Sequence, residues 1–157
     1  MIRVISDPFD PGAELSAFEK EASGAGAIVS FVGKVRAAAG GDSVKALCLE
    51  HYPGVTEQSI AEIENKARER WEIDDALIIH RVGELAPGDT IVMVCVASRH
   101  RREAFEAADF LMDYLKTEAM FWKKEIREGG AVWIEPRHAD YKDAARWNES
   151  GRDDEEE

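Results

Sequence analysis

Apolar residues recur along this chain with two periods, and the longest regular stretches have the period of a helix. Residues 53–71 and 98–118 place apolar side chains three or four positions apart. The first apolar stripe is Ile60, Ile63, Ala67 and Trp71, and the second is Ala104, Ala108, Leu111 and Leu115, widened by Phe105 and Met112. Both stretches are predicted to be amphipathic helices that cover a sheet. Shorter helices are predicted at 11–22, after the capping pair Asp10-Pro11, and at 139–147.

Short runs of β-branched and other apolar residues predict the strands. These runs are residues 2–5, 25–35, 44–52, 76–85, 90–97, 121–127 and 131–135. The Pro87-Gly88 step predicts a turn that pairs 76–85 with 90–97 as an antiparallel hairpin, and Gly129-Gly130 joins the last two runs in a closing hairpin. Residues 37–42 are small and glycine-containing, so we expect a flexible loop there. Long helices mixed with hairpins predict an α+β fold with a largely antiparallel sheet.

Length and charge limit the kind of protein this can be. The chain has 157 residues, 45% of them hydrophobic, and a formal net charge of −12 at pH 7. Residues 149–157 contain six acidic residues and one arginine, so we expect one domain over 1–148 and a disordered acidic tail over 149–157. An acidic body without a long basic run argues against nucleic acid or an anionic membrane as the main partner. With neither a long apolar stretch nor a signal-peptide pattern, we expect a cytoplasmic protein.

The residues that most often hold metals or act as nucleophiles form no recognisable motif here. Cys48 and Cys95 lie in apolar, strand-like runs, so both are predicted to be buried and unreactive. The four histidines share no metal-binding spacing, and the chain lacks the common nucleophile, zinc and phosphate-loop motifs. We therefore expect neither a catalytic metal nor a bound cofactor.

Basic residues gather at two places where the predicted fold would present them to a ligand. Lys34 and Arg36 end a strand, and strand alternation predicts that they share a face. The Arg-His-Arg-Arg run at 99–102 begins a helix, where free backbone N–H groups favour an anion. A phosphate site is one interpretation. The other is a solvated helix start with its arginines paired to acids such as Glu103 and Glu106.

A third basic group follows the second long helix. Lys116 ends that helix, and Lys123 and Lys124 come soon after, beside Phe121 and Trp122. Mutual repulsion and burial would lower lysine pKa values, which suits a lysine to proton transfer near neutral pH. Alternatively, Lys116 only complements the negative end of the helix dipole.

Five runs of the sequence, taken together and in order, closely resemble the large, catalytic subunit of molybdopterin synthase, the MoaE family. They are GAIVSFVGKVR (26–36), LEHYPGVTE (49–57), IIHRVGELAPGD (78–89), HRREAFEAADFLMDYLKT (100–117) and FWKKE (121–125). The resemblance covers about residues 2–147. It implies an α/β hammerhead-type fold with two long helices and a closing β-hairpin. It also implies a homodimer that binds small, ubiquitin-like sulfur-carrier subunits, giving a heterotetramer.

The activity implied by the resemblance is a sulfurtransferase of molybdenum cofactor biosynthesis. The carrier's thiocarboxylated Gly-Gly terminus would supply two sulfurs to cyclic pyranopterin monophosphate, forming the dithiolene of molybdopterin. Lys116 and Lys123 resemble the catalytic lysines. Positions resembling substrate-binding residues are Lys34, Val35, Arg36, His100, Arg101, Lys116, Lys123, Lys124, Glu125 and Arg137. The chain departs from the family pattern at Met120, where we expect a proline.

Two other functions stay open at this point. One is an inactive scaffold of the same fold that only binds the carrier protein, although retention of the basic residues together argues against it. The other is a generic nucleotide- or phosphate-binding module, which the lack of a glycine-rich phosphate motif disfavours.

The spacing of the basic groups also predicts a shared site. Arg101 and Lys116 are separated by about 22 Å if the helix between them is continuous, at ~1.5 Å per residue. One small substrate can contact both only if a two-fold dimer brings His100 and Arg101 of one subunit to Lys116 of the other.

Overall fold

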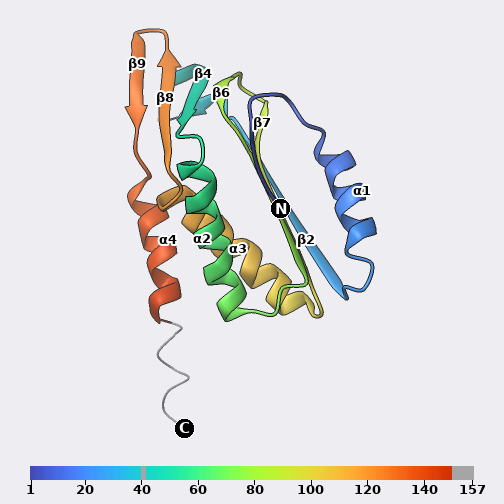
Figure 1. The fold of residues 1–157 in the computed structure, drawn as a ribbon. Coiled ribbons are helices and arrows are strands. Elements are labelled where there is room, and N and C mark those ends of the chain that lie inside the picture. Colours follow the sequence, from blue (N-terminus) through green and yellow to red (C-terminus); the bar gives the residue numbers. More distant parts are fainter. Residues whose placement is uncertain (40–41, 150–157) are drawn as a thin grey trace.

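The computed structural model describes residues 1–39 and 42–149, which form two sheets and four helices (Figure 1). The first sheet has the strand order β1 (Ile2–Ile5), β5 (Asp75–Arg81), β7 (Thr90–Ser98) and β2 (Ala27–Lys34). Only β1 and β5 run parallel in it, and the other pairs are antiparallel. The mixed α+β fold with largely antiparallel sheets is the one predicted from the sequence.

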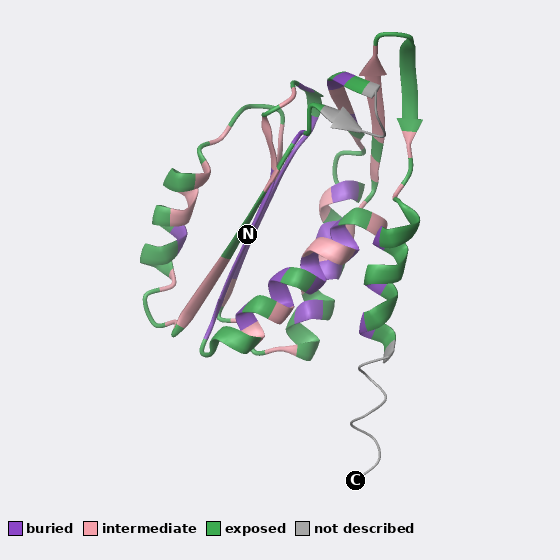
Figure 2. Cartoon of the chain, turned by 180° about the vertical axis from the view of Figure 1, so that it is seen from behind, coloured by how far each residue is buried: buried purple, intermediate pink, exposed green. Residues whose placement is uncertain are grey.

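Helices cover both faces of this first sheet. The helices α2 (Val55–Arg70) and α3 (Arg101–Thr117) bury one face, and α1 (Pro11–Glu21) packs on the other through Phe18. Asp10 caps α1 as expected, because its carboxylate accepts a hydrogen bond of 2.9 Å from the Gly12 N–H. The central strands β5 and β7 are buried along nearly their whole length, because both faces of the sheet are covered (Figure 2).

The second sheet is built around a long strand. Its order is β3 (Ala38–Ala39), β4 (Asp42–His51), β8 (Phe121–Arg127) and β9 (Gly130–Ile134), and β6 (Gly83–Leu85) also pairs with β4. The strands β8 and β9 form the closing hairpin predicted from the sequence. The last helix, α4 (His138–Glu149), follows β9 and packs against α3.

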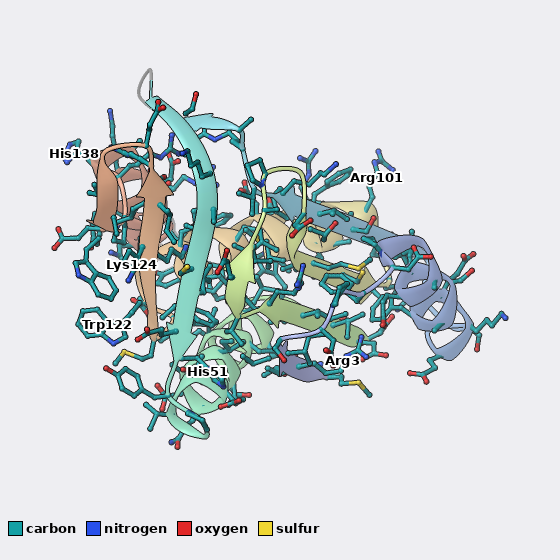
Figure 3. All side chains as sticks on the ribbon, turned by 90° about the horizontal axis from the view of Figure 1, so that it is seen from above. Arg3, His51, Arg101, Trp122, Lys124 and His138 are labelled. Carbon is teal, nitrogen blue, oxygen red and sulfur yellow. The ribbon has the colours of Figure 1, made fainter. Side chains whose placement is uncertain are left out.

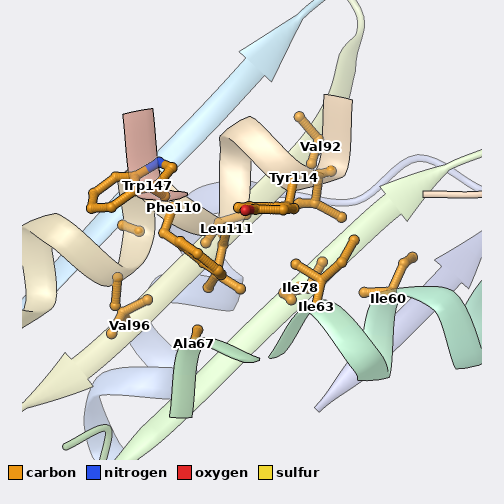
Figure 4. Close-up of a cluster of buried hydrophobic side chains, with 14 residues drawn as sticks. Ile60, Ile63, Ala67, Ile78, Val92, Val96, Phe110, Leu111, Tyr114 and Trp147 are labelled. Carbon is orange, nitrogen blue, oxygen red and sulfur yellow. The ribbon is translucent and has the colours of Figure 1, made fainter. Parts of the chain in front are cut away.

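Aromatic packing fixes α4 in place. Trp147 is 8% exposed and packs edge to face on Phe110, with ring centroids 5.5 Å apart (Figure 4). Its indole N–H donates a hydrogen bond of 2.7 Å to Asp113 of α3. The Arg70 guanidinium lies over the Trp147 ring and donates to its backbone carbonyl at 2.9 Å. These contacts hold the carboxyl end of α4 against the middle of α3.

Three local predictions were wrong. Residues 76–85 form two strands: β5 pairs with β7 as predicted, but β6 crosses to the second sheet, after a break at Val82 and a positive φ of +89° at Gly83. The segment 37–42, expected to be a flexible loop, contains the two-residue strand β3, which pairs with β4; residues 40 and 41 are outside the described part. Phe105 is 60% exposed, because it lies about 100° around α3 from the buried Ala104.

The remaining expectations concern the cysteines, the membrane and the tail. Cys95 is buried as predicted, and burial and then the nearby Glu14 raise its thiol pKa to about 11, whereas Cys48 is only partly buried. Among the described residues, no helix is long and apolar enough to cross a membrane. Helix α4 includes Glu149, and the tail residues 150–157 fall outside the described part, so their disorder stays a prediction.

Candidate active site

Two adjoining cavities lie where the two sheets meet α3 and the start of α4. Their volumes are about 440 and 590 Å³. The residues that line both are Arg36, Leu115, Lys116, Lys123, Glu125, Ile134 and Arg137. We call the two cavities together the basic pocket. Among the described residues, five lysine and arginine side chains line the first cavity, with a single carboxylate, that of Glu125.

The position of each lysine at the basic pocket follows from its place in its own helix or strand. Lys116 lies in the last turn of α3, on the side of Leu115 and Met112. In β8, strand alternation turns Lys123 and Glu125 toward the pocket. Both lysines that resemble catalytic residues therefore line the same cavities, although they come from different elements.

The segment after β2 reaches the pocket differently from the prediction. The pairing register of β2 with β7 shifts between Gly33 and Lys34, so simple alternation fails there. Lys34, Val35 and Arg36 all line the first cavity. Val35 is 7% exposed, and its backbone is held at both ends by the following turn: its N–H donates to Asp89 at 2.9 Å, and its carbonyl accepts from Gly88 at 2.8 Å.

Lys123 has an unusual electrostatic environment. Burial, reinforced by the positive charge of Lys116, lowers its pKa from 10.5 to about 8, and the negative charge of Asp140 partly opposes the change. A substantial fraction of Lys123 is therefore neutral in mildly alkaline solution. A lysine in this state can accept a proton or donate one, whereas an ordinary lysine is almost fully charged.

His80, which the sequence analysis did not select, also lines the first cavity. It is 5% exposed and stacks on Phe121 with ring centroids 4.1 Å apart. Burial and then the charge of Lys123 lower its pKa to about 3, so the imidazole is neutral at pH 7. Its Nδ1 lies 2.9 Å from the Arg81 carbonyl, which can only accept, so Nδ1 carries the proton and Nε2 is the acceptor.

Two carboxylates at the pocket are held by arginines. Glu125 accepts hydrogen bonds of 2.9 and 2.6 Å from Arg127 of the same strand. Asp140, in the first turn of α4, accepts from the Arg137 guanidinium at 3.0 and 3.4 Å. Asp140 lines the second cavity and was also missed by the sequence analysis.

Helix α2 holds the turn that leads into β8, where Met120 stands in place of the expected proline. The Thr56 hydroxyl donates to the Met120 carbonyl at 2.7 Å and accepts from the Tyr52 N–H at 2.9 Å. The Met120 N–H donates to the Ser59 hydroxyl at 3.1 Å. These bonds tie both the N–H and the carbonyl of Met120, in the segment before Lys123, to side chains of α2.

Three of the predicted site residues lie away from the basic pocket. Lys124 points to the other face of β8, where its ammonium lies 5.4 Å from the Trp133 ring centroid. His100 and Arg101 are exposed at the start of α3, at the far end of the helix from Lys116. Figure 3 shows Arg101 on the opposite side of the molecule from Trp122 and Lys124 of β8. Because α3 is continuous from Arg101 to Thr117, the separation of about 22 Å expected from the sequence applies.

The chemistry available in the pocket is anion binding and proton transfer. Its basic side chains would attract a phosphate or a carboxyl-type group, and arginine forks bind such groups with two parallel hydrogen bonds. Among the described residues, no group of three or more potential metal ligands comes together.

Comparisons with known proteins agree on one family. The family profile described as "MoaE protein" matches residues 4–118. A molybdopterin synthase catalytic subunit of Cereibacter sphaeroides is 51% identical over 146 residues, covering 93% of this chain and 99% of that protein. The MoaE protein structure from Burkholderia ambifaria superposes with a TM-score of 0.81 at 45% identity, covering 94% of this chain and 97% of that one. A Helicobacter pylori structure, described as the complex of subunits 1 and 2 of molybdopterin-converting factor, shares the fold with a TM-score of 0.73 at 21% identity, covering 87% and 91% of the two chains.

Proposed function

The chain belongs to the MoaE family, which includes catalytic subunits of molybdopterin synthase, and we propose that it transfers sulfur to a pterin phosphate. The sulfur donor is the thiocarboxylated C-terminus of a small, ubiquitin-like carrier subunit. The acceptor is cyclic pyranopterin monophosphate, and the product is the dithiolene of molybdopterin. The observation that carries the proposal is that Lys116 and Lys123 line one basic pocket.

The residues of the pocket have distinct roles in this proposal. Arg36, Lys34 and Arg137 bind the anionic groups of the pterin phosphate and of the incoming carrier terminus. Lys123 moves protons, because its lowered pKa keeps a useful fraction of the amine neutral. Lys116 stabilises negative charge that develops on the reacting groups. Each transfer exchanges the thiocarboxylate sulfur for an oxygen, so two carriers return as ordinary carboxylates for every dithiolene formed.

The carrier docks with only its flexible tail in the pocket. The Helicobacter pylori structure is a complex of two different subunits, and we extend that kind of assembly to this chain. Cavities of about 440 and 590 Å³ can hold a few residues of an extended tail but not a folded domain. Glycines at the end of such a tail let its backbone pass close to the pocket walls. The complete enzyme is then a heterotetramer in the cytoplasm, with two copies of each subunit.

The site is shared between the two copies of this chain. His100 and Arg101 lie too far from Lys116 of the same chain to contact one small substrate. In a two-fold dimer they complete the partner's pocket. Mixing an Arg101→Ala subunit with a Lys116→Ala subunit then restores activity, because one pocket of each mixed dimer has both groups intact. No recovery in verified mixed dimers would rule out sharing and leave the basic helix start as a separate feature.

The test of the function is product formation by the purified protein. The chain is incubated with thiocarboxylated carrier and cyclic pyranopterin monophosphate, and dithiolene is measured. Formation of product supports the sulfurtransferase. Carrier binding without product would instead favour an inactive carrier-binding scaffold, and binding of the pterin phosphate alone would favour a simple phosphate-binding module.

A further inference from the structure

Asp140 lines the second cavity of the basic pocket and makes several hydrogen bonds there, but it has no part in the roles proposed above. Its side chain is only 9% exposed, although it lies in the first turn of α4. One oxygen, Oδ2, accepts from the Arg137 backbone N–H at 2.9 Å and from its Nε at 3.4 Å, and Oδ1 accepts from the guanidinium at 3.0 Å. Asp140 therefore holds both the backbone and the side chain of Arg137.

Arg137 needs such an anchor because of where it lies. It follows β9 and precedes α4, its side chain is 61% exposed, and it lines both cavities. An unanchored arginine at the surface samples many rotamers, and an anion that binds it must fix one of them. Two hydrogen bonds from the guanidinium to Asp140 hold this side chain in place before the anion arrives.

The charge of Asp140 also acts on the two lysines. Burial opposes its ionisation, but the hydrogen bonds from Arg137 and the charge of Lys116 outweigh burial and lower the pKa of Asp140. In turn, the negative charge of Asp140 opposes the lowering of the Lys123 pKa. Asp140 is thus ionised at neutral pH.

The other charged and titratable groups at the pocket come from every element around it. They are Lys34 of β2, Arg36 after β2, His80 of β5, Lys116 of α3, Lys123, Glu125 and Arg127 of β8, Glu135 after β9, Arg137 before α4 and Tyr141 of α4. Of the carboxylates, Glu125 is held by Arg127. Asp140 is the one that is tied to Arg137 and acts on both lysines.

We infer that Asp140 is a positioning residue of the proposed sulfurtransferase, holding the Arg137 guanidinium at the pocket for an anion and balancing the charges of Lys116 and Lys123. The inference rests on the proposed function for its kinetic consequences. A purely structural role is the competing explanation, because the bond from the Arg137 N–H to Asp140 also caps the start of α4.

Asp140→Asn separates these two roles. Asparagine keeps a side-chain oxygen that can accept from the Arg137 N–H, but it removes the negative charge. The matched control is Asp143→Asn, at an exposed position of the same helix, which removes a charge that also acts on Arg137 but keeps the hydrogen bonds between Arg137 and Asp140. Both variants are measured as the full chain with saturating thiocarboxylated carrier.

The expected result is a raised KM for the pterin phosphate in Asp140→Asn, by roughly 10-fold, with a smaller change in kcat. In the pH profile of the reaction rate, the limb that reports the ionisation of Lys123 should move to lower pH by about half a unit or more, because the loss of the Asp140 charge lowers the Lys123 pKa. Asp140→Glu, which restores the charge, returns that limb toward its wild-type position. If Asp140→Asn matches Asp143→Asn in KM and in pH profile, the positioning role is overturned, whatever happens to stability.

A second measurement needs no turnover and so separates this inference from the proposed function. Acetylation of Lys123 by acetic anhydride, followed across pH by peptide mass spectrometry, reports its pKa directly. The pKa should fall in Asp140→Asn and stay near the wild-type value in Asp143→Asn and Asp140→Glu. An unchanged Lys123 titration in Asp140→Asn would overturn the charge-balancing role even in an active enzyme. If Asp140→Asn does not fold, the Asp140→Glu variant should keep the Lys123 titration but raise KM, and a wild-type KM in it would contradict the geometric role.

Discussion

Replacing Lys123 by methionine should stabilise the fold at neutral pH, and the gain should disappear as the pH rises. At pH 7 Lys123 is charged in both the folded and the unfolded chain, so the folded state bears the full cost of burying an ammonium group. Between pH 8 and 10.5 the folded chain has lost this proton while the unfolded chain still holds it. Unfolding then takes up a proton, so the contribution of Lys123 to the free energy of unfolding becomes more favourable as the pH rises.

The size of the effect follows from the pKa. Lowering the pKa from 10.5 to about 8 corresponds to about 3 kcal/mol between the charged and neutral forms. Titration of Lys123 should therefore raise the free energy of unfolding of the wild type by about 2.5 kcal/mol between pH 7 and pH 10. The stability of Lys123→Met relative to the wild type should therefore fall by about that amount over this range.

Urea denaturation of both proteins at pH 7 and pH 10 measures the difference. The control is Lys124→Met, which removes a lysine from the opposite face of the same strand, over Trp133. If wild type and Lys123→Met change in parallel with pH, to within about 0.5 kcal/mol, then Lys123 is solvated and the reasoning about its pKa is wrong.

Three further outcomes are expected. Lys123→Ala should impair dithiolene formation, but less severely than loss of Lys116, and equal or greater impairment would reverse the assigned roles. Adding one bulky residue to the carrier's C-terminus should block transfer, since the tail must pass through a narrow channel; an unchanged rate would contradict this docking. Thr56→Val should lower the free energy of unfolding by about 2 kcal/mol, because it leaves the Tyr52 N–H and the Met120 carbonyl without their buried partner. A urea midpoint equal to the wild type would show that water replaces the hydroxyl.

The sequence predicted those parts of the fold that depend on a local period. The stripe of Ala104, Ala108, Leu111 and Leu115 lies on one buried face of α3, as its spacing requires. The division of residues 76–85 between two sheets could not be predicted in this way. No local period separates the two strands, and the change of sheet depends on the pairing of β6 with β4, more than thirty residues earlier in the chain.

The candidate site was only partly visible in the sequence for the same reason. Lys116 and Lys123 were selected as a basic group suited to proton transfer, and the resemblance to a family added their catalytic role. The fold places both in one pocket. His80 and Asp140 belong to elements remote in sequence, so their convergence on Lys123 is a tertiary property. A signal was available for His80, which is a polar residue inside an apolar strand. Strand alternation could likewise have separated Lys124 from Lys123.

The most direct test of the central claim is the rate of dithiolene formation by Lys116→Ala, compared with the wild type when both are saturated with thiocarboxylated carrier. The account predicts that the variant folds, binds the carrier with wild-type affinity and forms no detectable product. Its circular dichroism and urea midpoint should match those of the wild type, because Lys116 is exposed at the end of α3. Product formation at the wild-type rate would remove Lys116 from the mechanism and contradict the assignment of the basic pocket as the site of sulfur transfer.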